Sequence, residues 1–202
     1  MLGGVAERRA RPSFTERRER ADERRARRGE VTDPSIVMEG AAAFLAVRPR
    51  SVTETRRRLR HLGYPHELIE TVLGRLVEMR YLDDEAFATS WVESRDRARP
   101  RGESALRREL SVKGIDREMV RAVLEGRATI EPGTDEPSPD RVAAERLLDR
   151  KRAALLRETD PRKRRHKAYA LLARNGFAPD VCREVAATLD AEVGPDGDSE
   201  DL

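Results

Sequence analysis

Apolar residues recur along this chain at spacings of three and four, and one short arrangement of them occurs three times around a glycine. Each copy has a Leu four positions before the glycine and a bulky apolar residue directly after it. Gly tolerates the left-handed conformation that closes a helix, and the apolar residue can fold back onto the last turn. The pattern therefore predicts a helix, a tight turn and a second helix around each of Gly63, Gly114 and Gly176.

A further amphipathic segment precedes each of these pairs, over residues 34–47, 84–97 and 140–156. Three helices in each of three copies give nine predicted helices, and no segment reads convincingly as a strand. Self-similar units of this size are typical of repeat proteins, in which small cores are strung along the chain. We predict an all-α fold of three tandem three-helix repeats in an elongated array.

Composition separates the repeats from flanking segments. Residues 1–30 are rich in Arg and acids with few apolar groups, the last residues are acidic, and a Pro- and Gly-rich stretch precedes the third copy. Such compositions favour disorder or linkers over packed structure. The predicted organisation is an Arg-rich disordered or frayed tail at 1–32, repeats at 33–81, 82–126 and 140–189, a linker at 127–139 and an acidic disordered tail at 190–202.

Motifs for catalysis, cofactors or metals are missing from the sequence. It has no Gly-rich phosphate loop and no dinucleotide fingerprint, and its three His and one Cys have no zinc spacing. Cys182 aligns with apolar core positions of the other copies, which predicts packing rather than nucleophilic chemistry. Asp83 and Asp84 precede a helix, where carboxylates cap free N–H groups. We expect no catalytic residue, metal or cofactor, and hence no enzyme.

Cysteine usage and hydropathy indicate the compartment. A single cysteine excludes an intramolecular disulfide and suits a reducing cytosol. No signal peptide is recognisable, and no apolar run approaches the length of a membrane span. We therefore expect a cytoplasmic monomer without a membrane partner.

Basic residues are the most informative surface feature, although the net charge is only +3. Arginines recur at the same distances from the glycine in the first two copies, and a further basic run opens the second helix of the third. A single run is usually a solvated helix face, but recurrence in a stacked array favours a basic stripe that attracts nucleic acid or an acidic protein. The candidate contact residues are Arg95, Arg101, Arg107, Arg108 and Lys113, then Arg56, Arg57, Arg58 and Arg60, then Arg162, Lys163, Arg164, Arg165 and Lys167.

One segment carries a family resemblance. Residues 81–95 read Tyr-Leu-Asp-Asp-Glu-Ala-Phe-Ala-Thr-Ser-Trp-Val-Glu-Ser-Arg. Arg101-Gly102, Leu106, Glu109-Leu110 and Lys113-Gly114-Ile115 follow. Together with the triplicated helices, this combination resembles the RecX family of recombination regulators over about residues 34–189. Within it we assign packing and turn roles to Phe87, Trp91, Leu110 and the three repeat glycines, and cap roles to Asp83 and Asp84.

The resemblance implies a curved, all-helical fold and a partner. Such proteins bind the active filament that RecA forms on single-stranded DNA, and they restrain its ATP hydrolysis, strand exchange and coprotease activity. Single- or double-stranded DNA is then a weaker, salt-sensitive partner. Two alternatives stay open: a direct DNA binder that competes for single strands, against which the 4% aromatic content argues, and a helical adaptor for another acidic partner.

Overall fold

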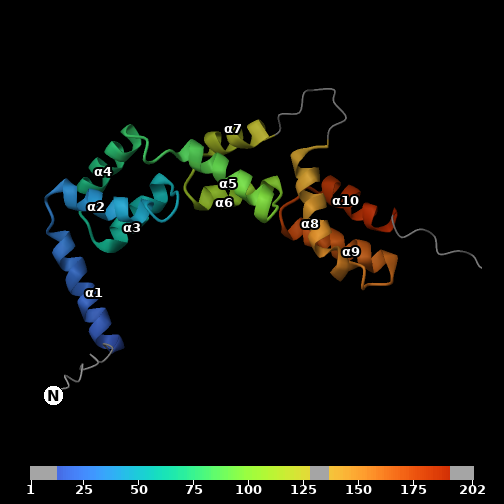
Figure 1. Cartoon of the computed structure of the whole chain (residues 1–202), viewed down its shortest axis with the longest axis horizontal. Coiled ribbons are helices and arrows are strands. Elements are labelled where there is room, and N and C mark those ends of the chain that lie inside the picture. Colours follow the sequence, from blue (N-terminus) through green and yellow to red (C-terminus); the bar gives the residue numbers. More distant parts are fainter. Residues whose placement is uncertain (1–12, 128–136, 192–202) are drawn as a thin grey trace, which may run out of the picture. The chain divides into compact units, whose positions relative to one another are not determined.

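The computed structural model describes residues 13–127 and 137–191 (Figure 1). This part of the chain forms ten helices and no strand, which confirms the all-α prediction. The chain divides into two compact units, Met1–Leu82 and Asp83–Leu202. The helices are α1 (Phe14–Gly29), α2 (Pro34–Leu45), α3 (Val52–Leu62), α4 (His66–Glu78), α5 (Asp84–Ala98), α6 (Glu103–Val112), α7 (Arg117–Arg127), α8 (Pro139–Leu155), α9 (Pro161–Arg174) and α10 (Pro179–Ala191).

The three repeat glycines close helices as predicted. Gly63, Gly114 and Gly176 have φ values of 97°, 79° and 86°, in the left-handed region that a side chain disfavours. In the first repeat the N–H groups of Gly63 and Tyr64 donate to the last carbonyls of α3, at 3.0 and 3.3 Å. These bonds satisfy acceptors that the end of a helix would otherwise leave free.

Each three-helix set has a small core of its own. Helices α2, α3 and α4 bury a cluster that includes Leu59 and Ile69, and α5, α6 and α7 bury one that includes Phe87 and Leu110. Helices α8, α9 and α10 enclose a third cluster, in which Cys182 is fully buried. Burial raises the pKa of the Cys182 thiol, with the nearby charges of Asp180 and Asp140 adding to the effect, so this residue packs as predicted.

Helix α1 is the main departure from the predicted organisation, because it lies inside the segment expected to be a disordered or frayed tail. Its capping box explains its start: the Ser13 N–H donates to Glu16 at 2.7 Å, and the Glu16 N–H donates to Ser13 Oγ at 3.2 Å. Arg and Glu are good helix formers, so the segment needs no buried face to be helical. Residues 1–12, 128–136 and 192–202, where we predict tails and a linker, lie outside the described residues.

Repeats 2 and 3, the sets α5–α7 and α8–α10, meet backbone to backbone. The Gly102 N–H donates to the Asn175 carbonyl at 3.0 Å, and Ser104 Oγ donates to the Gly176 carbonyl at 2.8 Å. The start of α6 therefore lies directly against the turn that ends α9. Residues 103–108 and 174 are placed by this contact, and they supply part of the candidate site.

Candidate partner-binding groove beside Trp91

A groove of about 530 Å³ lies on unit Asp83–Leu202 and is lined mainly by cationic side chains. Helix α5 supplies Trp91 and Arg95, which are one turn apart. Helix α6 supplies Arg108 and Glu109, and the last residue of α9 supplies a further arginine. Five cations face one carboxylate here, so the groove has a strongly positive charge. The cations are Arg95, Arg101, Arg108, Lys113 and Arg174.

Trp91 lines the groove and contacts two of its cations. Its ring lies 4.4 Å from the Arg95 guanidinium carbon and 4.7 Å from Lys113 Nζ, and it stacks on Phe87 with ring centroids 5.9 Å apart. The indole N–H donates to Glu109 at 2.9 Å. Trp91 is thus half-buried at the edge of the core, in contact with both a core ring and two cations of the groove.

Glu109 is the carboxylate that orients Arg95 and Arg101 in the groove. Its Oε2 accepts from Trp91 and from Arg95 Nε, the latter at 2.6 Å. Arg101 Nε lies 3.4 Å from Glu109 Oε1, an ion-pair distance at which this N–H makes no hydrogen bond. One carboxylate therefore orients two guanidinium groups, and cations outnumber carboxylates five to one among the side chains that line the groove.

The third repeat completes the groove. Arg101 donates through Nη1 to the Asn175 side chain, and Arg174 lines the same surface from the end of α9. Sequence reasoning missed Arg174, because the equivalent positions before the other two glycines hold His61 and Val112. No local signal marks it, since its place in the groove depends on how the two repeats pack.

Trp91→Ala is expected to lower the free energy of unfolding by about 2 kcal/mol. The change removes the stack on Phe87 and two cation–π contacts. Removing a half-buried ring destabilises a protein less than removing a fully buried one, for which a loss of about 3–5 kcal/mol is typical. Chemical unfolding followed by far-ultraviolet circular dichroism measures the difference. An unchanged midpoint would mean that the ring contributes nothing to packing.

Adjacent arginines on α6 point to different surfaces, although both were predicted to contact a partner. Arg108 lines the groove, whereas Arg107 lies on another face with Ile115 and Arg117. Arg107 pairs with Glu103 one turn earlier, and its Nε donates at 2.8 Å. The structure therefore brings Arg95, Arg101, Arg108 and Lys113 together and leaves Arg107 outside their cluster.

The predicted residues of the first repeat lie in unit Met1–Leu82. Arg56 forms a bidentate ion pair with Glu70, at 2.8 and 2.9 Å, which joins α3 to α4. It therefore stabilises the repeat. Arg58 lies 5.8 Å from the ring centroid of Phe44, while Arg57 and Arg60 are exposed on α3. Hydrogen bonds and charge from Arg56, with further charge from His66 and Arg60, lower the pKa of Glu70 despite the opposing effect of desolvation.

The basic run of the third repeat is divided by the helix that carries it. Arg164 is 5% exposed and donates to the Glu158 carbonyl at 3.2 Å, so its predicted role as a partner contact is corrected to a structural one. Lys163 and Lys167 pair with Asp160 and Glu158. A second basic cavity of about 500 Å³ is lined by Arg162, Arg165, His166, Tyr169 and Arg183, of which sequence reasoning had singled out only the first two as contacts.

Other kinds of site have little support in residues 13–127 and 137–191. No group of three or more His, Cys, Asp or Glu side chains there could hold a metal ion. Within the same ranges, no helix has the length and apolar character needed to cross a membrane. Asp83 serves as the predicted cap, since its side chain accepts from the Ala86 N–H at 2.9 Å.

Comparisons with known proteins match all three repeats. Models for the first, second and third three-helix domains of RecX match residues 39–76, 83–124 and 140–186. The regulatory protein RecX of Mycobacterium avium (strain 104) is 35% identical over 153 residues, which cover 74% of this chain and 82% of the relative. That of Thermobifida fusca (strain YX) is 34% identical over 145 residues, covering 71% and 74%.

A solved structure of RecX from Lactobacillus salivarius has the same fold. It superposes with a TM-score of 0.64 at 21% identity and covers 78% of this chain and 97% of that one. Helix α1 precedes the first matched segment, which begins at residue 39. The three matched domains and the identity of the relatives show that this chain belongs to the RecX family of regulatory proteins.

Proposed function

We propose that this protein regulates RecA by binding the filament that RecA forms on single-stranded DNA, with the groove beside Trp91 as a principal contact. The family is one of regulatory proteins, not enzymes. The observation that carries the site is the excess of five cations over one carboxylate around a half-exposed aromatic ring. Such a surface complements DNA phosphates or an acidic protein surface. Binding there restrains ATP hydrolysis, strand exchange and coprotease activity of the filament.

Reversing two charges in the groove, Arg108→Glu with Lys113→Glu, is expected to raise the concentration needed for half-inhibition of RecA by at least about tenfold. Like charges placed against a complementary partner cost several kcal/mol, and each 1.4 kcal/mol is a factor of ten. The measurement is single-stranded-DNA-dependent ATP hydrolysis by the cognate RecA, with this protein below one molecule per RecA protomer. Excess DNA is present throughout, so that competition for free strands is suppressed.

Arg107→Glu is the control for position, because it reverses one charge on the same helix as Arg108 but outside the groove. It should shift half-inhibition by no more than about twofold. Equal loss in both variants would place the contact elsewhere on α6, and full potency of the groove variant would remove the groove from the interface.

A direct single-strand binder is the second candidate, and the pairing of Trp91 and Tyr169 with arginines in two cavities favours it. Aromatic rings beside cations can stack unpaired bases while the cations neutralise phosphates. This function predicts that excess DNA abolishes the inhibition and that affinity falls steeply with salt. Inhibition that persists under excess DNA selects the filament regulator.

A further inference from the structure

Helix α1 separates its charges onto two halves of its surface. At about 100° per residue, its seven arginines occupy one half and its four acids the other. Every described side chain from Ser13 to Arg27 is exposed. Four of the arginines recur at spacings of three, four and three, which places them in one row roughly 15 Å long. This α1 arginine row consists of Arg17, Arg20, Arg24 and Arg27.

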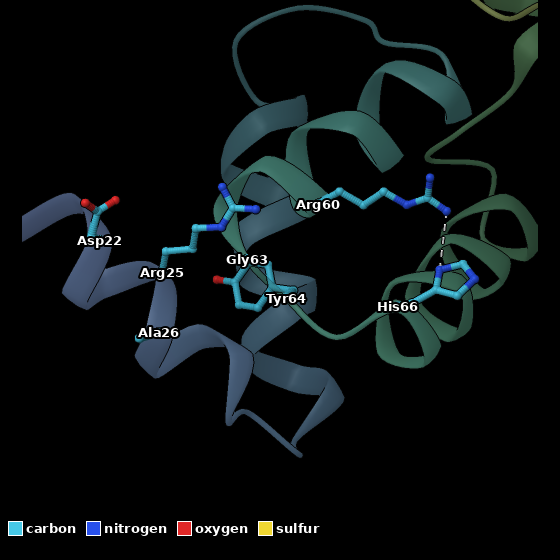
Figure 2. A pocket seen from close by; sticks show the side chains of 7 residues that line it. All are labelled: Asp22, Arg25, Ala26, Arg60, Gly63, Tyr64 and His66. Carbon is cyan, nitrogen blue, oxygen red and sulfur yellow. Dashed lines mark hydrogen bonds between the residues drawn. The ribbon is translucent and has the colours of Figure 1, made fainter. Parts of the chain in front are cut away.

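The side of α1 that faces away from this row, which carries Asp22, Arg25, Ala26 and Gly29, contacts the first repeat. A side chain at Gly63 would lie 2.5 Å from Arg25 Cγ and 2.8 Å from the Arg25 carbonyl oxygen, so the helix backbone passes directly over this turn. Arg28 lies 5.6 Å from the ring centroid of Tyr64. Figure 2 shows Arg25 between α1 and the turn that carries Gly63 and Tyr64, beside a cavity of about 480 Å³. These contacts leave the arginine row facing away from the repeat.

Carboxylates do little to neutralise the row. Among the described residues, none forms an ion pair with Arg17, Arg24 or Arg27. Arg20 interacts electrostatically with Glu16, whose pKa is lowered mainly by its hydrogen bonds with Ser13. A straight row of four guanidinium groups suits a linear polyanion better than a single small anion, because each group can bind a separate phosphate in a bidentate manner.

An exposed aromatic ring indicates which polyanion fits. Phe14 is 74% exposed and lies in the basic half of α1, one turn before Arg17 and Arg18. An aromatic ring beside a basic row can stack an unpaired base, an interaction that a duplex does not offer. Phe14 therefore favours a single strand over a duplex or an acidic protein surface.

We infer that α1 is an arm that binds the phosphate backbone of a single DNA strand through Arg17, Arg20, Arg24 and Arg27, with Phe14 stacking on a base. The choice of DNA over RNA rests on the proposed function. The binding of a single strand by the arginine row and Phe14 is argued from α1 alone. The arm lies before the three matched RecX domains, so it adds a contact that the repeats themselves do not supply. It anchors the chain on DNA independently of the groove beside Trp91.

The test measures binding of the full chain to a fluorescent oligothymidylate of about 20 nucleotides across a salt series, without RecA. Changing Arg17, Arg20, Arg24 and Arg27 together to Gln should reduce the slope of log K against log[salt] by about 3, since each neutralised phosphate of a single strand contributes roughly 0.7. Gln and Lys are both good helix formers, so α1 should stay helical by circular dichroism. The matched control, Lys at the same four positions, should keep the slope.

Phe14→Ala tests the choice of a single strand. It should weaken binding to the oligothymidylate at least threefold and leave binding to a duplex of equal length unchanged. An unchanged salt slope in the Gln variant overturns the arm, and equal losses on duplex and single strand overturn the stacking role. Neither result bears on the proposed binding to the RecA filament, because the variant Arg108→Glu with Lys113→Glu tests that proposal separately.

Discussion

Replacing Arg127 with Met is expected to lower the free energy of unfolding of unit Asp83–Leu202 by about 2–3 kcal/mol. This is less than the roughly 3–5 kcal/mol lost when one partner of a fully buried ion pair is removed, because the carboxylates of Asp96 and Asp140 are 24% and 17% exposed. The Arg127 side chain is 9% exposed and donates to both oxygens of Asp96, at 2.8 and 2.9 Å, and to Asp140 at 2.6 Å. Met fills much of the space but leaves two carboxylates without their cation.

Burial by itself would lower the pKa of Arg127, but hydrogen bonds and charge from Asp96 and Asp140 more than offset it, so the pKa is raised. The guanidinium is therefore charged at every accessible pH. Adding Asp96→Asn and Asp140→Asn to Arg127→Met should recover much of the lost stability, because no partly buried carboxylate then remains without its cation. Urea unfolding followed by circular dichroism measures both variants. A single variant within about 1 kcal/mol of the parent would show that this triad does not hold repeats 2 and 3 together.

This triad illustrates what the sequence could not predict. Arg127 was assigned to the linker at 127–139, which was predicted from its Pro- and Gly-rich composition. Its partners are thirty-one residues earlier and thirteen later. Periodicity reports which face of a helix is buried, but it carries no information on which long polar side chains meet across two packed repeats.

Local signals were read correctly where one residue decides the geometry. The Leu four positions before each repeat glycine is fully buried in all three copies, as Leu59, Leu110 and Leu172. A capping box of Ser51 and Glu54, a signal carried by four consecutive residues, starts α3. Helix ends depend on a few neighbouring residues, so they can be predicted from a short segment. The cap at Ser13 was of the same kind, but the low apolar content around it was given more weight.

The arginine positions show why a repeated pattern need not repeat a role. Arg56 and Arg107 stand at the same distance from their glycines, yet both are used in structural ion pairs, with Glu70 and Glu103. Arg108 occupies the next position and faces the groove. Which arginine remains available is decided by the acids around it, and these acids differ between the repeats.

Gly102→Ala is expected to lower the free energy of unfolding by about 3 kcal/mol through a clash between backbones. A Cβ at this position would lie 2.2 Å from the Gly176 carbonyl oxygen and 2.4 Å from the Phe177 nitrogen. Gly102 has φ −75° and ψ 162°, a conformation open to any residue, so the loss measures packing between repeats 2 and 3 and not backbone strain.

Gly126→Ala is the matched control, because nothing lies within 4 Å of a Cβ there and Ala stabilises a helix by about 0.5–1 kcal/mol over Gly. Thermal unfolding should therefore show a lower Tm than the parent for Gly102→Ala and a higher Tm for Gly126→Ala. The clash should also shift Arg101 relative to Arg174. Under the function proposed above, Gly102→Ala should therefore weaken RecA inhibition at temperatures where its helical circular dichroism is intact. If the Tm of Gly102→Ala matched that of Gly126→Ala, repeats 2 and 3 would not pack through Gly102 and Gly176. The groove would then be formed by the second repeat alone.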